Sequence, residues 1–309
     1  MVAPVLVAAV AAVLAPARVV FVDATRGTVL RTVSLPGEGA AIFAAPDGRT
    51  LVPLRGEDAT AVVSPSGAVE TWRGRLFPLF PSEGDRMAVV LPGLLAVLSY
   101  PERLPLVRVP LDGVGGALRA ACSEDGRLVV LIPAGAGART LLVVAVAEGG
   151  TARSAALAGE ATSLALMPDG AVAVTASGAT LAAVVVGEPQ ARPAIDAGGE
   201  VRSLCTVPGD REVLAGLAVG AAGEVLGVRV DRKARQPLSE RFRTRLPAPV
   251  SALAASGDEV VAVSGETLVL LRKGRRIAGQ LPLPGARDVA FLPLVARTTL
   301  PQWSDAPGR

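Results

Sequence analysis

Short apolar runs separated by turn residues recur along the whole chain. The runs are about four to seven residues long and rich in Val, Leu and Ala, and helical periodicity is hard to find. They end in turn-forming residues, as in "APDG" at 45–48 and "MPDG" at 167–170. This pattern predicts an all-β protein built from many short strands and tight turns.

One phrase, an apolar strand that ends in a Pro/Ser-Asp-Gly type of turn, recurs at intervals of about 40 residues. Its seven copies lie at residues 40–49, 76–86, 118–127, 162–170, 202–211, 251–259 and 287–294. Each copy is followed by further short strands, which makes four strands per repeat. Four strands in about 40 residues is typical of a β-propeller blade. The sequence therefore predicts a seven-bladed β-propeller of four-stranded antiparallel blades.

The order of the strands predicts how the ring closes. If the strand before each Asp-Gly turn is the innermost one, residues 18–36 supply only the two outer strands of a blade. The missing inner strands are then expected at the other end of the chain, at residues 287–294 and 295–300. The last blade is therefore expected to be closed by N- and C-terminal strands together, which leaves no open sheet edge.

The repeat resembles the "YVTN" β-propeller repeat of 40 residues, best in its first and fourth copies. In the stretch "RVVFVDATRGTVLRTVSLPGEGAAIFAAPDGRTLVPL", the residues on that family's pattern are Asp23, Gly27, Gly37, Pro46, Asp47 and Gly48. The family's closing Tyr-Val-Thr/Ala-Asn is replaced by segments such as "LVPLRG". The resemblance implies a propeller fold, but related propellers include lactonases, quinoprotein subunits and periplasmic binding proteins, so it implies no single activity.

The amino-terminal apolar run resembles a secretory signal peptide. It ends at Ala15-Pro16-Ala17, an Ala-x-Ala site that predicts cleavage before Arg18. We therefore expect a signal peptide at 1–17, a single propeller domain at 18–300 and a C-terminal tail at 301–309. The mature chain is expected to be exported to the periplasm or the extracellular space, without a membrane span. If the run is not a signal peptide, the expected location is the cytoplasm.

Composition excludes several kinds of chemistry. The chain contains no His and no Asn, which excludes Ser-His-Asp catalysis, His metal sites and N-glycosylation. The net charge is only +3, and aromatic residues make up 3%. The nearest basic cluster, at 229–245, also holds Asp231 and Glu240 and is interpreted as a solvated outer strand pair with its turn. We expect no cofactor, no catalytic residue and no nucleic-acid partner.

A set of charged residues is expected at the mouth of the central channel. A Glu precedes the innermost strand in three copies, and Arg residues and one Asp share its neighbourhood. The candidate binding residues are Glu38, Arg75, Arg119, Glu160, Glu200, Arg202, Arg287 and Asp288. Two interpretations stay open: the set holds a polar ligand, a cation or a partner's loop, or it solvates the mouth through Glu–Arg pairs of small energy. The Asp of each Asp-Gly turn is expected to serve turn geometry.

These features favour a monomeric, non-enzymatic, exported propeller that serves as a binding or scaffold module for a protein or polymer partner. The alternative is a lactonase-like or hydrolase-like propeller enzyme, in which carboxylates at the channel mouth hold a metal ion. That alternative requires Asp and Glu oxygens that converge on one ion, at about 2.3–2.6 Å for calcium. No metal ligand is assigned from the sequence.

Overall fold

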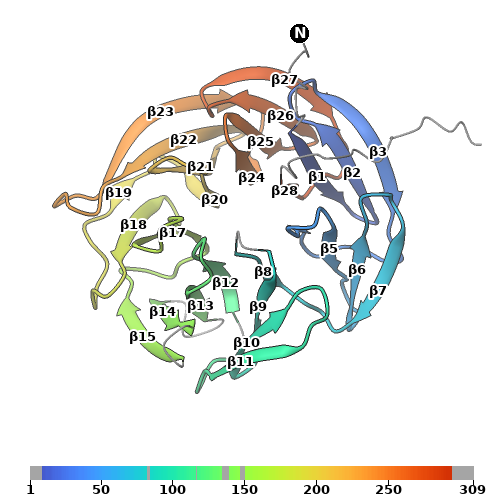
Figure 1. Ribbon diagram of the computed structural model, residues 1–309. Helices are drawn as coiled ribbons and strands as arrows, with labels where there is room; N and C mark the ends of the chain where they lie inside the picture. The colour runs from blue at the N-terminus through green and yellow to red at the C-terminus, as the bar shows by residue number, and fades with distance from the viewer. Residues whose placement is uncertain (1–8, 82–83, 116, 134–138, 147–149, 294–309) are drawn as a thin grey trace, which may run out of the picture.

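The computed structural model describes residues 9–81, 84–115, 117–133, 139–146 and 150–293. Seven four-stranded antiparallel sheets stand around a central axis and form a closed ring (Figure 1). The predicted fold class, a seven-bladed β-propeller, is confirmed. No helix within these residues has the length and hydrophobicity needed to cross a lipid bilayer.

The first four blades follow one another along the chain, each described here from its innermost to its outermost strand. Blade 1 consists of β4 (Phe43–Ala44), β5 (Thr50–Pro53), β6 (Ala59–Val63) and β7 (Val69–Arg73). Blade 2 consists of β8 (Pro78–Leu79), β9 (Arg86–Leu91), β10 (Leu94–Ser99) and β11 (Pro105–Pro110). Blade 3 consists of β12 (Ala117–Cys122), β13 (Leu128–Pro133), β14 (Thr140–Ala145) and β15 (Thr151–Ala156). Blade 4 consists of β16 (Ser163–Leu166), β17 (Val172–Ser177), β18 (Thr180–Val185) and β19 (Ile195–Asp196).

The remaining three blades include the longest strands and the closing blade. Blade 5 consists of β20 (Glu200–Thr206), β21 (Glu212–Val219), β22 (Ala222–Val230) and β23 (Leu238–Leu246). Blade 6 consists of β24 (Val250–Ser256), β25 (Glu259–Ser264), β26 (Thr267–Arg272) and β27 (Arg276–Pro282). Blade 7 consists of β28 (Asp288–Phe291), β1 (Val10–Ala15), β2 (Arg18–Asp23) and β3 (Thr28–Ser34). Each of the seven segments predicted to be innermost overlaps the innermost strand of its blade, and three of these strands begin one or two residues earlier than predicted: β12, β20 and β24.

Blade 7 is closed by both ends of the chain, as predicted, but with a different second strand. β1 pairs antiparallel with β28 on one side, where Val13 faces Val289, and with β2 on the other, where Val13 faces Val20. The prediction that residues 295–300 fill this position is wrong, because β1 occupies it. The domain is expected from the sequence to begin at residue 18, whereas residues 10–15 form a strand of this blade. Residues 294–309, which include the expected tail, lie outside the described residues.

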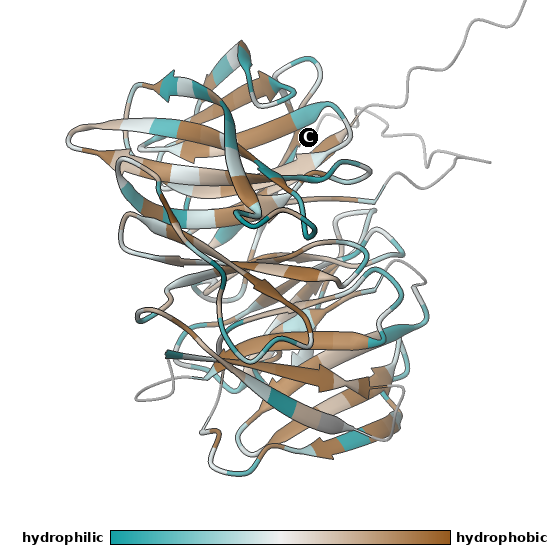
Figure 2. Cartoon of the chain, turned by 90° about the vertical axis from the view of Figure 1, so that its left-hand side faces the viewer, coloured by the Kyte–Doolittle hydropathy of each residue, from teal (hydrophilic) through white to brown (hydrophobic). Residues whose placement is uncertain are grey.

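The core consists of Val, Leu and Ala side chains packed between neighbouring blades. At the junction of blades 7 and 1, for example, Leu14 and Val19 pack in one cluster with Val52 and Val63, all of them at most 1% exposed. Figure 2 shows hydrophobic residues along many strands and hydrophilic residues in many of the connecting turns. Small β-branched and Ala side chains suit these flat interfaces, since they fill the narrow space between two sheets.

The Asp-Gly turns have the structural role that the sequence predicts. The Oδ1 atoms of Asp47, Asp125 and Asp169 each accept a hydrogen bond of 3.0 Å from the backbone N–H two residues further on. The glycine that follows Asp47 has a φ of +83°, which L-residues with a side chain rarely adopt. These carboxylates are therefore turn residues and not a ligand set.

Candidate functional site

The central channel is the best-defined cavity that involves the predicted site residues. It has a volume of about 530 Å³ and is lined by residues on or beside the innermost strands of all seven blades. Its lining residues include Ser163, Ser203 and Ser251 and the aromatic residues Phe43 and Phe77. The channel therefore offers both polar and apolar contacts to a bound group.

The charged residues in the channel wall are mostly basic. Arg55, Arg119, Arg202 and Arg287 line the cavity, whereas Asp288 is the one acidic residue among the described lining residues. The lining side chains themselves therefore carry a net positive charge, part of which Glu38 and Glu200 beside the cavity offset. Clefts lined by one sign of charge concentrate ions of the other sign.

Only half of the predicted site residues lie in this wall. The four that line the channel are Arg119, Arg202, Arg287 and Asp288. The four that do not are Glu38, Arg75, Glu160 and Glu200. The structure thus brings three of the four predicted arginines together with Asp288 and leaves Arg75 and the repeated Glu residues outside the cavity lining.

Glu38 acts as a counter-ion for two residues of the channel wall. Its carboxylate accepts a hydrogen bond from the Arg287 guanidinium, and its Oε1 lies 3.6 Å from Nε of Arg55. The hydrogen bond from Arg287 is the main cause that lowers the pKa of Glu38. Because these side chains are about half exposed, the pairing contributes little to stability.

The other two repeated Glu residues also pair with arginines, each in its own place. Oε2 of Glu200 lies 3.0 Å from Nη2 of Arg202, and Oε1 of Glu160 lies 3.8 Å from Nε of Arg139. Within the part of the chain that the structure describes, no three Asp, Glu, Cys or His residues gather as metal ligands do. The geometry favours the interpretation in which the repeated Glu residues pair with Arg, and gives no support to a metal held by them.

Irregularities in two innermost strands present polar side chains to the channel. In β20, Val201 and Ser203 pair with consecutive residues of β21, so Arg202 is an extra residue without a partner in the neighbouring strand. Ser251 is the extra residue in β24 for the same reason. Bulges of this kind redirect a side chain, and both extra residues line the channel.

An aromatic pair lies beside the basic residues. The rings of Phe43 and Phe77 meet edge to face, with centroids 6.2 Å apart, and Phe77 is 40% exposed. The Arg75 guanidinium lies 5.3 Å from the centre of the Phe77 ring. Arg75 therefore supports a wall residue instead of lining the channel itself. Sequence reasoning missed Arg55 and both Phe residues, because no local signal distinguishes them from other loop and strand residues.

Asp288 joins blade 7 to blade 1 at the channel wall. Its Oδ2 accepts a hydrogen bond of 3.0 Å from the backbone N–H of Ile42, and its Oδ1 accepts one of 2.9 Å from the N–H of Val289. Burial raises the pKa of Asp288 to about 6, against the lowering effects of these two hydrogen bonds and of Arg119. The carboxyl group is thus partly protonated near pH 6.

The raised pKa of Asp288 predicts a specific dependence of stability on pH. Between its ordinary value of 3.8 and about 6, the folded protein binds more protons at this group than the unfolded chain does. The contribution of Asp288 to the free energy of unfolding is therefore full below pH 3.8 and is lost as the pH rises to 6. Urea denaturation at several pH values should show this fall in the wild type but not in Asp288→Asn. Identical pH profiles for the two proteins would contradict the assignment.

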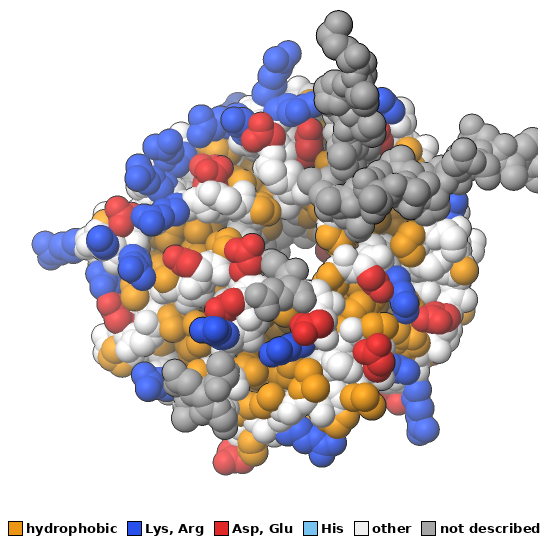
Figure 3. Space-filling view, in the orientation of Figure 1, with side chains coloured by type: hydrophobic (Ala, Val, Ile, Leu, Met, Phe, Trp, Pro, Cys, Tyr) orange, Lys and Arg blue, Asp and Glu red, His pale blue; other side chains and the backbone are white. Residues whose placement is uncertain are grey.

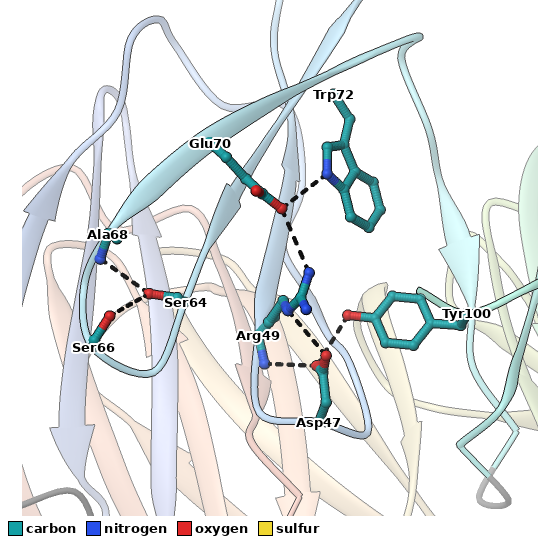
Figure 4. Close-up of polar contacts among 8 residues, drawn as sticks. All are labelled: Asp47, Arg49, Ser64, Ser66, Ala68, Glu70, Trp72 and Tyr100. Carbon is teal, nitrogen blue, oxygen red and sulfur yellow. Dashed lines mark hydrogen bonds and ion pairs between the residues drawn. The ribbon is translucent and has the colours of Figure 1, made fainter. Parts of the chain in front are cut away.

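Aromatic residues that are far apart in the sequence meet between blades 1 and 2 (Figure 4). The Trp72 ring lies 6.3 Å from that of Tyr100, and Tyr100 Oη donates a hydrogen bond of 2.9 Å to Asp47 Oδ1. Trp72 Nε1 donates to Glu70 Oε1 at 2.9 Å, and Arg49 pairs with both carboxylates. Burial is the main cause that raises the pKa of Tyr100. This cluster holds two blades together, and none of its residues lines the channel.

The two cysteines, Cys122 of β12 and Cys205 of β20, are free thiols on innermost strands of different blades. Burial raises the pKa of Cys122 to about 11 and that of Cys205 to about 12. Both thiols are therefore protonated near neutral pH, and only thiolates are strong nucleophiles. Neither cysteine has the environment of a catalytic residue.

Comparisons with known proteins show the fold. No family model and no curated protein sequence matches the chain. It is similar to the structure of a functionally unknown protein from Desulfotomaculum acetoxidans DSM 771 (TM-score 0.72, 12% identity, 92% of this chain and 99% of that one). It is also similar to the RRP9 WD40 repeats (TM-score 0.68, 12% identity, 91% of this chain and 89% of that one). A chain of the Mitotic Checkpoint Complex is similar as well (TM-score 0.65, 14% identity, 84% of this chain and 83% of that one).

At such low identities these similarities show the fold alone. The chain is a seven-bladed β-propeller, with WD40-repeat proteins among its structural neighbours. The YVTN type of repeat remains a prediction, since no family model matches. A propeller fold fits a binding module, and the particular function has to be argued from the site.

Proposed function

We propose that this propeller is a binding module that holds an acidic segment of a partner protein in its central channel. The observation that carries the proposal is the lining of the channel by four arginines and one aspartate. Arg guanidinium groups donate two parallel hydrogen bonds to a carboxylate, which makes them suited to Asp, Glu or C-terminal carboxylates. The Phe43 and Phe77 rings add an apolar surface for the neighbouring side chains of such a segment.

The structural neighbours support a binding role without naming a partner. One of them belongs, by its title, to the Mitotic Checkpoint Complex, which is an assembly. The alternative of a lactonase-like or hydrolase-like enzyme has less support. Its metal would require carboxylates that converge, and Glu38, Glu160 and Glu200 instead pair with arginines in different places.

The proposal also covers the oligomeric state, the need for a cofactor and the location of the protein. We take it to act as a monomer, without a cofactor and without a nucleic-acid partner. We also propose that the protein is exported, with any signal-peptide cleavage before Val10, where β1 begins. Cleavage before Arg18 would remove β1, which pairs with both β2 and β28.

The proposal predicts that reversing charges in the channel abolishes capture of the partner. In a pull-down from native extract, wild type should retain a partner that Arg119→Glu/Arg202→Glu loses. Arg108→Glu/Arg153→Glu is the matched control, because both residues are exposed on outer strands away from the channel. If both variants retained the partner, the channel would not be the site that binds it. Capture of no partner by wild type would contradict the binding function itself.

A further inference from the structure

The positive charge of the protein is concentrated on one hairpin. Residues 229–245, "RVDRKARQPLSERFRTR", contain seven Arg and Lys and two Asp and Glu, a net charge of 7 − 2 = +5. The whole chain carries +3, so the rest of the chain carries 3 − 5 = −2. A local excess of this size directs binding toward partners of negative charge.

These residues belong to the hairpin formed by β22, β23 and the turn between them; with Glu224 of β22 included, the hairpin carries 7 − 3 = +4. It is the longest hairpin among the described residues. Its two strands have nine residues each, and in Figure 1 its turn extends outward beyond the ring. All seven basic side chains are exposed to solvent. Figure 3 shows Lys and Arg side chains gathered on the rim of the molecule over β22 and β23.

Most of these basic side chains have no partner within the described residues. Only Arg243 and Arg245 form ion pairs, with Glu224 and, for Arg243, also with Glu240. The other five side chains make no hydrogen bond or ion pair with any described residue: Arg229, Arg232, Lys233, Arg235 and Arg241. Arg241 interacts electrostatically with Glu212, and the charges of the other four are available to a partner.

A neighbouring turn extends this basic surface. Arg211, between β20 and β21, lines a cleft of about 100 Å³ together with Arg232. The backbone carbonyl of Arg211 accepts a hydrogen bond of 2.9 Å from Val230 N–H, which holds the two turns side by side. Asp169 also lines the cleft, but its Oδ1 accepts the N–H of Ala171 in its own turn. The cleft thus adds one more unpaired arginine to the hairpin.

The hairpin is held in place by polar contacts at its turn and at its base. At the turn, Asp231 Oδ1 accepts the N–H of Lys233 at 3.0 Å, and Arg192 Nη1 donates to the carbonyl of Ala234 at 3.4 Å. At the base, Thr244 Oγ1 donates to the carbonyl of Gly274 at 2.8 Å. A surface that is already ordered loses less conformational entropy when a partner binds.

The side chains of this surface suit an acidic protein segment better than a nucleic acid or an anionic membrane. The one aromatic residue in the hairpin, Phe242, has its ring covered by the Arg275 guanidinium at 4.9 Å, so it offers no free face on which a base could stack. None of the exposed large hydrophobic residues lies within 229–245, so the surface has no apolar anchor for a membrane. Arginine forks match carboxylates and phosphates alike, and without an aromatic face or an apolar anchor beside them this surface favours the carboxylates of an acidic protein segment over stacked bases or a membrane.

We propose that this hairpin and Arg211 form a docking surface for an acidic, extended segment of a protein. The surface is separate from the channel. Arg202, near the beginning of β20, and Arg211, beyond its end, lie at opposite ends of one strand, on the order of 20 Å apart for six or seven residues. The docking surface therefore does not depend on the proposed function of the channel.

The test uses a fluorescein-labelled peptide of ten Glu residues as the probe, with binding measured by fluorescence anisotropy at two salt concentrations. Wild type should bind the probe, and more weakly at high salt, because salt screens exposed charges. Arg232→Glu/Lys233→Glu/Arg235→Glu should weaken binding about tenfold or more, since each reversal turns an attraction into a repulsion. The matched control Arg73→Glu/Arg108→Glu/Arg153→Glu makes the same change in net charge on other outer strands and should lose less than about threefold.

A further variant separates this proposal from that of the channel. Arg119→Glu/Arg202→Glu removes the contribution of the channel, which is itself proposed to hold an acidic segment. This variant should still bind the probe, and adding the three hairpin substitutions to it should weaken that binding about tenfold. Equal losses in the hairpin variant and the matched control would overturn the proposal, as would absence of binding by wild type. Tighter binding of a DNA duplex or of anionic phosphatidylserine vesicles, with the same dependence on the hairpin, would overturn the assignment of the partner as a protein.

Discussion

A protein without residues 1–17 is expected to lose its cooperative fold. The deletion removes β1, whose residues Ala11 to Ala15 are at most 1% exposed, and leaves the facing edges of β2 and β28 unpaired. Burial of Val13 and Leu14 alone contributes on the order of 5 kcal/mol. This is comparable with the whole stability of many proteins. Circular dichroism and thermal melting of the purified variant would measure the loss.

The control is a variant that begins with Met followed directly by Ala9, which keeps β1 whole. It should melt within a few degrees of the full chain. If the 1–17 deletion melted at the same temperature as the control, another segment would have to fill the place of β1. Residues 295–300, which the sequence predicts for that place, would then be the first candidate.

Trp72→Ala is expected to have the largest effect of any single substitution between blades 1 and 2. The indole is 8% exposed, packs on Tyr100 and lies under the Arg103 guanidinium at 4.5 Å from its centre. Truncation of a buried Trp to Ala costs about 3–5 kcal/mol. For a chain of this size the melting temperature should fall by roughly 10 °C, measured by calorimetry.

Two milder substitutions separate burial from the other contacts of Trp72. Trp72→Phe keeps much of the apolar volume but loses the hydrogen bond to Glu70. Arg103→Ala removes only the cation–π contact, which contributes about 0.5–1 kcal/mol at an exposed site. Both should lower the melting temperature much less than Trp72→Ala does. A Trp72→Ala variant as stable as Arg103→Ala would show that this cluster does not hold the two blades together.

The blades could be predicted from the sequence because each turn has its own local chemistry. Asp47 hydrogen-bonds the backbone N–H of Arg49, and Gly48 adopts a positive φ. Both requirements are met by the residues of the turn itself, without contacts from other blades. The repetition of such turns at regular intervals therefore predicts the number of blades.

β1 could not be assigned correctly from the sequence because its composition suits both a signal peptide and a buried strand. Val10–Ala15 is an apolar run of Val, Ala and Leu, as expected for a signal peptide and equally for a strand buried on both faces. Its pairing with β28, at the far end of the chain, decides between them. No local feature of the sequence expresses a contact of such long range.

The channel wall was predictable only in part. Arg119, Arg202, Arg287 and Asp288 could be expected there because they lie on or next to innermost strands, whose positions follow from the repeat. The repetition of Glu38, Glu160 and Glu200 is visible in the sequence and predicts a shared site. Their pairing with arginines depends on the fold and is not visible there. Arg55 comes from the loop between β5 and β6, the two middle strands of blade 1, and the exposure of Phe77 depends on the packing of two blades.

The central claim is that the channel holds a segment of a partner protein, and crosslinking tests it most directly. A photo-reactive phenylalanine analogue would replace Phe77, which lines the channel, and, in a second protein, Leu104, which is 62% exposed in the turn after β10. After illumination in native extract, we expect a crosslinked partner from position 77 and none from position 104. A crosslink from position 104 alone, or none from either position, would show that the channel does not hold a segment of the partner.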